Sequence, residues 1–257
     1  MPLTADVVAY LDQLLGIPGT PDYPTALNGL QVANRGTVSR VAAAVDGSHR
    51  TIEGAITVGA DLLLVHHGLF WKGAQPIVGA QYLRLRALVE HDMAVYAAHL
   101  PLDRHPMLGN NALLAHELGL TPSGGFAQFE SIAIGVRGAA DIPTADLVAR
   151  AARFARAHGG DAHGTAFPDA RRTRSWAICT GGGASTETLD EAVALGVDTL
   201  IVGEGPHWTA VDAPERGLVI IYAGHYATET PGVRALARDV ASRFGVPWEF
   251  IAAPTGR

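Results

Sequence analysis

The 257-residue chain has one cysteine, Cys179, and no apolar run as long as a membrane-spanning helix. A single cysteine excludes a disulfide within the chain and a zinc site built from several thiolates. A transmembrane helix needs about 20 consecutive apolar residues, so we expect no membrane span. The first residues also lack the charged and then apolar pattern of a secretory signal peptide. We therefore expect a cytoplasmic protein.

Positive charge is also scarce. The 19 lysines and arginines are outnumbered by 25 aspartates and glutamates, which gives a net charge of −6. Nucleic-acid-binding domains usually present a strongly basic surface, so nucleic acid is not an expected partner. The 48% hydrophobic content is that of an ordinary folded chain and argues against disorder.

Short apolar runs alternate with segments of helical periodicity along the whole chain. The run from Asp61 to Val65 is almost wholly apolar, as is typical of a parallel strand buried on both faces. Alternating strands and helices predict an α/β fold with mostly parallel sheets. The predicted strands cover residues 38–45, 61–65, 93–98, 131–136, 176–180, 198–202 and 218–223. Thr4 can cap a first predicted helix that Gly16 ends, and a second helical stretch follows residue 45 and ends at Gly59. The later predicted helices cover residues 80–91, 107–118, 144–158, 186–195 and 233–244.

The second half of the chain repeats the order of the first. Gly59-Ala-Asp-Leu-Leu-Leu-Val65 aligns with Gly196-Val-Asp-Thr-Leu-Ile-Val202, and Tyr96-Ala-Ala-His99 aligns with Tyr222-Ala-Gly-His225. An acid follows each of these histidines four residues later. We interpret this as an internal duplication, with residues 1–125 as the first α/β repeat and residues 126–257 as the second. The loop-like residues 122–125 mark the expected boundary.

Polar residues that suit metal binding follow the predicted strands. Side chains at the carboxyl ends of parallel strands converge on one edge of a sheet, and the residues expected there are His66, His67, Asp103, His225 and Glu229. Nitrogen and oxygen ligands without sulfur favour Zn, Mn, Fe, Co or Ni over Ca. The two oxygens of Glu229 could bridge a pair of ions. The sequence therefore predicts two divalent metal ions per chain.

Each of these residues also has an alternative interpretation. Asp103 could cap the helix that follows it, and Glu229 could supply first-turn charge to the helix after Pro231. The glycine-rich stretch from Gly181 to Ser185 could hold a phosphate, but it lacks the Gly-Lys-Ser/Thr of a phosphate-binding loop, which favours a tight turn.

Four segments resemble the signatures of one family. They are Asn28-Gly-Leu-Gln-Val32, His66-His-Gly-Leu-Phe-Trp71, His99-Leu-Pro-Leu-Asp103 and Gly224-His-Tyr-Ala-Thr-Glu229. They resemble the Nif-three-like family of dinuclear-metal hexameric proteins, often labelled GTP cyclohydrolase I type 2 homologues. The resemblance implies two intertwined α/β repeats, a homo-hexameric ring and a di-metal site in the cleft between the repeats. It also implies that His67 and Asp103 bind one ion and His66 and His225 the other, with Glu229 bridging.

The function that these features favour is a metal-dependent hydrolase acting on a small nucleotide-like or phosphorylated substrate, including GTP cyclohydrolase-like activity. The candidates for proton transfer are His99, Glu204 and His207. His99 could instead support a metal ligand or be purely structural. The segment Gly203-Glu-Gly-Pro-His-Trp208 has one histidine where many relatives have two. The alternative to an enzyme is a non-catalytic hexameric scaffold, interaction partner or metal-trafficking protein.

Overall fold

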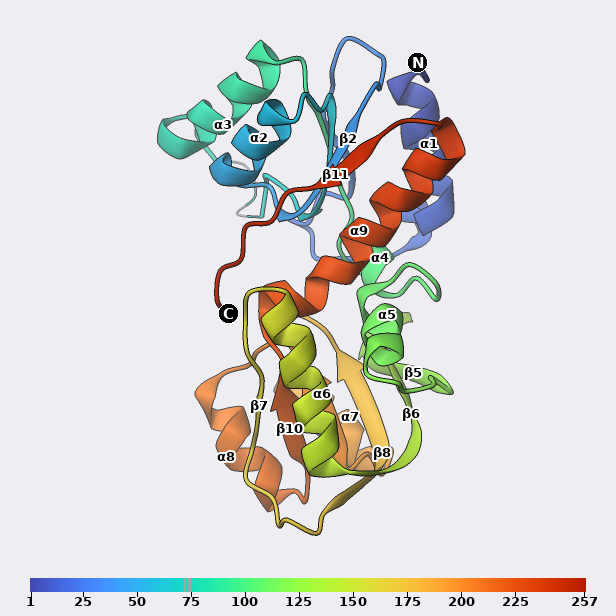
Figure 1. Ribbon diagram of the computed structural model, residues 1–257, viewed down its shortest axis with the longest axis vertical. Helices are drawn as coiled ribbons and strands as arrows, with labels where there is room; N and C mark the ends of the chain where they lie inside the picture. The colour runs from blue at the N-terminus through green and yellow to red at the C-terminus, as the bar shows by residue number, and fades with distance from the viewer. Residues whose placement is uncertain (72, 74) are drawn as a thin grey trace. The chain divides into compact units, whose positions relative to one another are not determined.

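The computed structural model describes residues 1–71, 73 and 75–257, and it has the predicted α/β architecture (Figure 1). The chain forms two compact units, each with its own sheet. The first unit contains residues 1–102 and 232–253, and the second contains residues 103–231 and 254–257.

These bounds differ from the predicted halves, residues 1–125 and 126–257. Residues 124–129, which begin within the predicted boundary loop, form a strand that pairs with the next strand of the second unit. Near the C-terminus, a strand at residues 248–250 pairs with the strand at residues 41–46 and returns the chain to the first unit. The two units are therefore intertwined along the chain, as the family resemblance implied.

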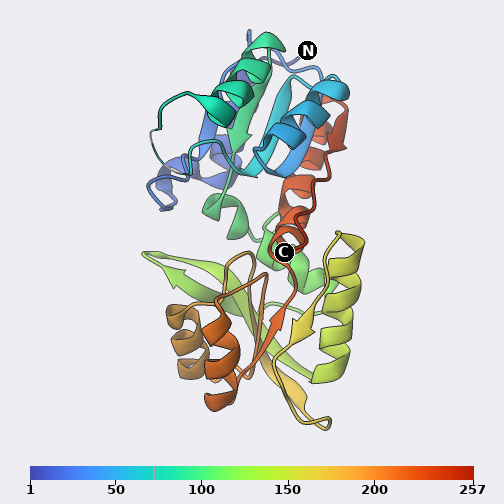
Figure 2. The same cartoon turned by 90° about the vertical axis from the view of Figure 1, so that its left-hand side faces the viewer.

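The first unit has a five-stranded sheet in the order β1-β4-β3-β2-β11, in which only the edge strand β1 is antiparallel to its neighbour. Helices α2 and α3 cover one face, and α1 and the later part of α9 cover the other (Figure 2). The central strands β3 and β4 are buried throughout, apart from the last residue of β3. The elements are α1 (Thr4–Leu15), η1 (Ile17–Gly19), β1 (Gly29–Val32), β2 (Val41–Asp46), α2 (His49–Thr57), β3 (Leu62–His67), α3 (Gly79–Glu90), β4 (Ala94–Ala97), α4 (Leu100–Asp103), which ends on the first residue of the second unit, and β11 (Trp248–Phe250).

The second unit has a six-stranded sheet in the order β5-β6-β8-β9-β10-β7, with β8, β9 and β10 parallel and the other pairings antiparallel. One core cluster packs α5 and α6 against the sheet, and another packs α7 and α8 against its opposite face. The elements are α5 (Asn110–Glu117), β5 (Gly124–Phe129), β6 (Ile132–Pro143), α6 (Thr144–Ala157), β7 (His163–Gly164), β8 (Arg172–Cys179), α7 (Thr186–Ala194), β9 (Thr199–Val202), α8 (His207–Glu215), β10 (Val219–Tyr222) and α9 (His225–Phe244), which continues into the first unit.

The strand order confirms the predicted duplication. In each unit, three parallel strands follow one another in sequence and in space, β2-β3-β4 in the first and β8-β9-β10 in the second. A strand that precedes each set lies antiparallel at its far edge, β1 beside β4 and β7 beside β10. Val65 and Val202 therefore end equivalent central strands.

Local details match as well. Ser48 caps α2 and Ser185 caps α7, each through a capping box with the threonine three residues later. Asp61 accepts the backbone amides of Ser39 and Arg40, and Asp198 accepts the equivalent pair in the second unit. The repeats therefore share the hydrogen bonds that cap helices α2 and α7. They also share the hydrogen bonds that hold the backbone near the starts of strands β2 and β8.

The five predicted metal ligands lie in elements other than those predicted. His66 and His67 are the last residues of strand β3 and do not follow it. Asp103 ends the short helix α4 and does not cap the next helix. Helix α9 begins at His225, eight residues before the predicted start at residue 233. The sequence predicted a helix start after Pro231 because proline removes a helical hydrogen bond. The helix nevertheless continues through Pro231.

Among the described residues, no helix is both long enough and apolar enough to cross a membrane.

The capping boxes give a first prediction. Ser185→Ala is expected to lower the free energy of unfolding of the second unit by about 1 kcal/mol, because the amide of Thr188 loses its acceptor. The measurement is hydrogen exchange of the slowest amides of β8 and β9. Ser185→Asp, which keeps an acceptor, should retain most of the protection, and equal protection in the alanine variant would contradict a stabilising cap.

Candidate metal centre

His66 and His67 are each oriented by a hydrogen bond at the ring nitrogen Nδ1. His66 is fully buried, and its Nδ1 lies 2.8 Å from the carbonyl oxygen of Ala98. Nδ1 of His67 lies 2.9 Å from a carboxylate oxygen of Asp46, its register partner at the end of the neighbouring strand β2. A histidine that donates through Nδ1 presents Nε2 as the nitrogen for a metal ion.

His99 joins this pair. Its ring centroid lies 4.9 Å from that of His66 and 5.8 Å from that of His67. One ligand atom from each of the three histidines can be chosen so that all lie within 4.8 Å of one another. The ring of Trp71 packs against His99 edge-on, with centroids 4.6 Å apart. The sequence predicted a role for His99 near the metals but did not place its ring in a cluster with both histidines.

Asp22 anchors His99. Its carboxylate lies 2.8 Å from Nδ1 of His99 and accepts hydrogen bonds from the side chain of Asn28 and the amide of Leu100. Burial alone would raise the pKa of Asp22, but these hydrogen bonds and the nearby imidazole outweigh burial and hold the pKa below its ordinary value. Asn28 also accepts the backbone amide of His99. The motif that begins at Asn28 thus supports the histidine cluster from a different part of the chain.

In the second unit, Asp103 and Glu229 are buried carboxylates beside one tight turn. Asp103 accepts a hydrogen bond of 2.8 Å from the side chain of Asn110 and lies 3.5 Å from the hydroxyl of Thr180. The next residue, Gly181, has a φ of +63°, and a Cβ there would stand 2.1 Å from Oε1 of Glu229. The glycine-rich stretch is therefore a tight turn that makes room for Glu229, in agreement with the interpretation that the sequence favoured.

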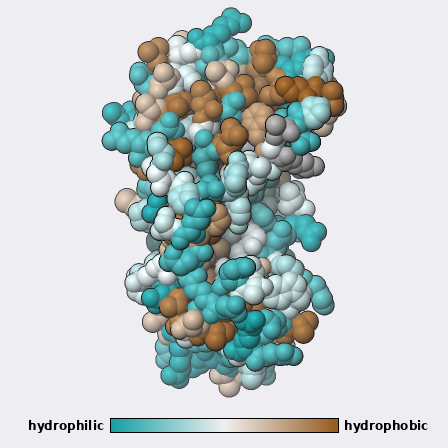
Figure 3. All heavy atoms as spheres, turned by 180° about the vertical axis from the view of Figure 1, so that it is seen from behind, coloured by the Kyte–Doolittle hydropathy of each residue, from teal (hydrophilic) through white to brown (hydrophobic). Residues whose placement is uncertain are grey.

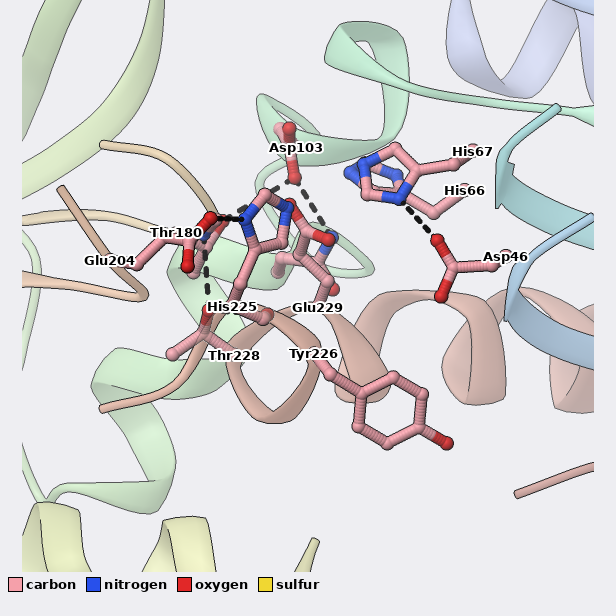
Figure 4. A network of polar contacts seen from close by, with 12 residues as sticks. Asp46, His66, His67, Asp103, Thr180, Glu204, His225, Tyr226, Thr228 and Glu229 are labelled. Atoms are coloured by element: carbon pink, nitrogen blue, oxygen red, sulfur yellow. Dashed lines mark hydrogen bonds and ion pairs between the residues drawn. The ribbon is translucent and has the colours of Figure 1, made fainter. Parts of the chain in front are cut away.

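His225 lies between two carboxylates (Figure 4). It starts helix α9, and Glu229 one turn later brings Oε1 to 3.2 Å from its Nε2. Its Nδ1 lies 3.0 Å from Oε1 of Glu204, which follows strand β9. Glu204 thus fixes the ring of His225 through Nδ1, and its part in proton transfer stays a prediction. His207 is exposed at the start of α8 and is not in either cluster.

The electrostatics of this cluster favour positive charge. Burial lowers the pKa of His225, but the hydrogen bonds and charges of Glu229 and Glu204 raise it more, to about 9. The two carboxylates therefore stabilise a cation at the imidazole, and a divalent ion would benefit from the same field. Nitrogen and oxygen donors held in this way fit the ligand chemistry of Zn, Mn, Fe, Co or Ni.

Known proteins resemble this chain over almost its whole length. The family model DUF34/NIF3 (NGG1p interacting factor 3) matches residues 3–255. A Deinococcus radiodurans protein named GTP cyclohydrolase 1 type 2 homolog is 41% identical over 98% of this chain and 93% of its own length. A protein of the same name from Halobacterium salinarum is 42% identical over 98% of both chains.

Solved structures show the same fold. The protein ybgI, described as of unknown function, superposes with a TM-score of 0.87 at 33% identity and covers 99% of this chain and 100% of its own. TTHA1606 from Thermus thermophilus has a TM-score of 0.82 at 36% identity and covers 98% and 99% of the two chains. The fold and the clusters thus define a duplicated α/β protein with a candidate metal centre. The chain belongs to the DUF34/NIF3 family.

The orienting acids give a second prediction. Glu204→Ala and Asp46→Ala are each expected to weaken divalent-metal binding roughly 10–100-fold, because a ligand histidine loses the partner that fixes its ring. Competition with a chelator of known affinity measures the effect. Glu215→Ala removes an exposed acid at the end of α8 and is the matched control. Unchanged affinity in both orienting variants would show that these hydrogen bonds do not support a metal centre.

Proposed function

We propose that this protein is a metal-dependent hydrolase that acts on a small phosphorylated or nucleotide-like substrate. The observation that carries the proposal is the shared orientation of the histidines. His66, His67, His99 and His225 each engage Nδ1 with a carboxylate or carbonyl, so that Nε2 is the nitrogen presented for binding. Metal-ligating histidines usually donate through their other ring nitrogen to a carboxylate or a carbonyl. His91 and His158 also engage a carbonyl through Nδ1, but within their own helices, whereas these four histidines use acceptors from other segments of the chain.

We further propose that the two clusters complete one dinuclear centre. The first unit supplies imidazoles, and the second supplies two buried carboxylates and one imidazole. With the assignment that the family resemblance implies, His67 and Asp103 would hold one ion, His66 and His225 would hold the other, and Glu229 would contribute to both. Two divalent ions at such a site act as Lewis acids and lower the pKa of bound water.

The chain's own residues supply orientation and proton transfer. His99 is fixed at Nδ1 by Asp22, which places its Nε2 near the ligand nitrogens and lets it hold or release a substrate proton. Glu204 keeps the ring of His225 in place. The name GTP cyclohydrolase 1 type 2 homolog, carried by relatives at about 40% identity, supports a nucleotide-like substrate.

The direct test is a screen of metal-loaded protein against nucleotides and phosphoesters. Turnover that disappears in Glu229→Ala and persists in Glu215→Ala would support the proposal. Full metal occupancy without turnover on any phosphorylated compound would contradict it and favour a scaffold or metal-trafficking role.

Metal content gives the third prediction. The protein is expected to bind about two divalent ions per chain, as a two-metal site requires. Glu229→Ala should lose both because it removes the bridge, whereas His67→Ala should lose one. Elemental analysis after metal loading and desalting measures both. One ion lost in each variant would indicate two independent sites, and no metal in the parent protein would contradict the centre itself.

We also propose a homo-hexamer, which the family resemblance implies. A feature of the first unit is compatible with assembly, because hydrophobic side chains gather where α3 lies (Figure 3). Leu88 is the one residue of α3 that is buried among the described residues, while Tyr82, Leu83 and Val89 are exposed.

The fourth prediction follows from this proposal. Light scattering at micromolar concentration should report about six times the chain mass of 26.9 kDa. Val89→Glu on the exposed face of α3 tests whether that face contributes, with Val211→Glu on α8 as a matched control for an exposed valine. A stable monomer of the parent protein would contradict the hexamer.

A further inference from the structure

A pocket of about 430 Å³ lies in the second unit at the carboxyl ends of β9 and β10. Ligands of parallel α/β sheets bind at this end of the strands. The loop after β9 carries Glu204 and the start of α8 carries His207 into the pocket wall, and Arg257 approaches from the C-terminal segment. Tyr222 and His163 form another wall, with their rings stacked at a centroid distance of 5.2 Å. None of the metal ligands named above lines this pocket.

Glu204 connects the pocket to the candidate metal centre. One carboxylate oxygen lies 3.0 Å from Nδ1 of His225, and the other lies 3.5 Å from Nε of Arg257. A ligand that contacts Arg257 is therefore two side chains away from a candidate metal ligand.

We propose that this pocket binds a phosphoryl group of the substrate through Arg257, His207 and the N-terminus of α8. The inference rests on the proposed hydrolase function and adds where the substrate is anchored. Helix α8 begins at His207, which lines the pocket, so the first backbone amides of the helix lie at the pocket wall. These amides and the helix dipole favour an anion, and an arginine adds charge-assisted hydrogen bonds.

The acids of the pocket do not cancel this preference. Asp161 forms an ion pair of 3.1 Å with Arg156 and accepts the amide of Ala162, which together hold its pKa below the ordinary value. One oxygen of Glu204 is engaged by His225. The ion pair between Glu204 and Arg257 is solvent-exposed, with 81% of the arginine side chain accessible. Exposed pairs contribute little free energy, so a phosphate can take over the guanidinium at small cost.

The test uses the full-length protein after removal of metal ions by a chelator, and its probe is inorganic phosphate. Without metal ions, phosphate bound at this pocket is not confused with phosphate bound to a metal. Calorimetry should detect saturable binding at millimolar phosphate. Arg257→Gln is expected to weaken that binding about tenfold or more, because a charge-assisted contact is lost. His207→Gln should weaken it by a smaller factor.

Arg153→Gln, which removes an arginine of a different pocket on α6, is the matched control and should bind phosphate as the parent does. Absence of saturable binding, or equal binding by Arg257→Gln, would overturn the inference. A second measurement separates this outcome from failure of the proposed function. If a phosphorylated substrate is hydrolysed with the same KM by the parent protein and Arg257→Gln, the pocket is wrong and the hydrolase stands. If phosphate binds and Arg257→Gln weakens it, the pocket stands whether or not the loaded protein turns over any substrate.

Discussion

The orientation of the imidazoles is the constraint on which the candidate centre depends. An imidazole ring can rotate and can exchange its proton between two nitrogens, so a histidine alone does not define a ligand position. Here each ring is fixed by an acceptor on another segment: Asp46 for His67, the carbonyl of Ala98 for His66, and Glu204 for His225. These acceptors lie at or just beyond strand ends, and strand register brings Asp46 opposite His67. The sheets therefore determine which nitrogen each histidine presents.

Equivalent backbone positions in the two duplicated units carry different side chains. In the alignment that ends at Val65 and Val202, His66 corresponds to Gly203 and His67 corresponds to Glu204. A Cβ at Gly203 would stand 2.5 Å from the carbonyl oxygen of Gly181 and 2.8 Å from Cα of His225, so no histidine fits there. The second repeat has instead a carboxylate at the next position, which orients His225. The second repeat thus has a support for His225 at the position where the first repeat has His67.

Sequence reasoning identified the strands that are buried on both faces, because an uninterrupted apolar run such as Leu62 to Val65 fits few other environments. It missed the short edge strands β1 and β7 and the strand β11, where pairing with a distant segment decides the structure. It grouped the candidate ligands because each of them follows a predicted strand. It did not find Asp22 or Asp46 as partners of histidines, since nothing local to an aspartate shows which ring it will face 77 or 21 residues away.

Pro231 shows why the start of α9 escaped prediction. A proline inside a helical pattern normally marks a helix boundary, and here Pro231 and Gly232 do mark the point where the chain passes from one unit to the other. The helix nevertheless runs through them, with His225 and Glu229 in its early turns and the buried Val233, Leu236 and Val240 in the later ones. The hydrophobic face of the later turns belongs to the core of the first unit. The turn that carries the two candidate ligands is thus joined to that core by continuous helix, without a flexible loop.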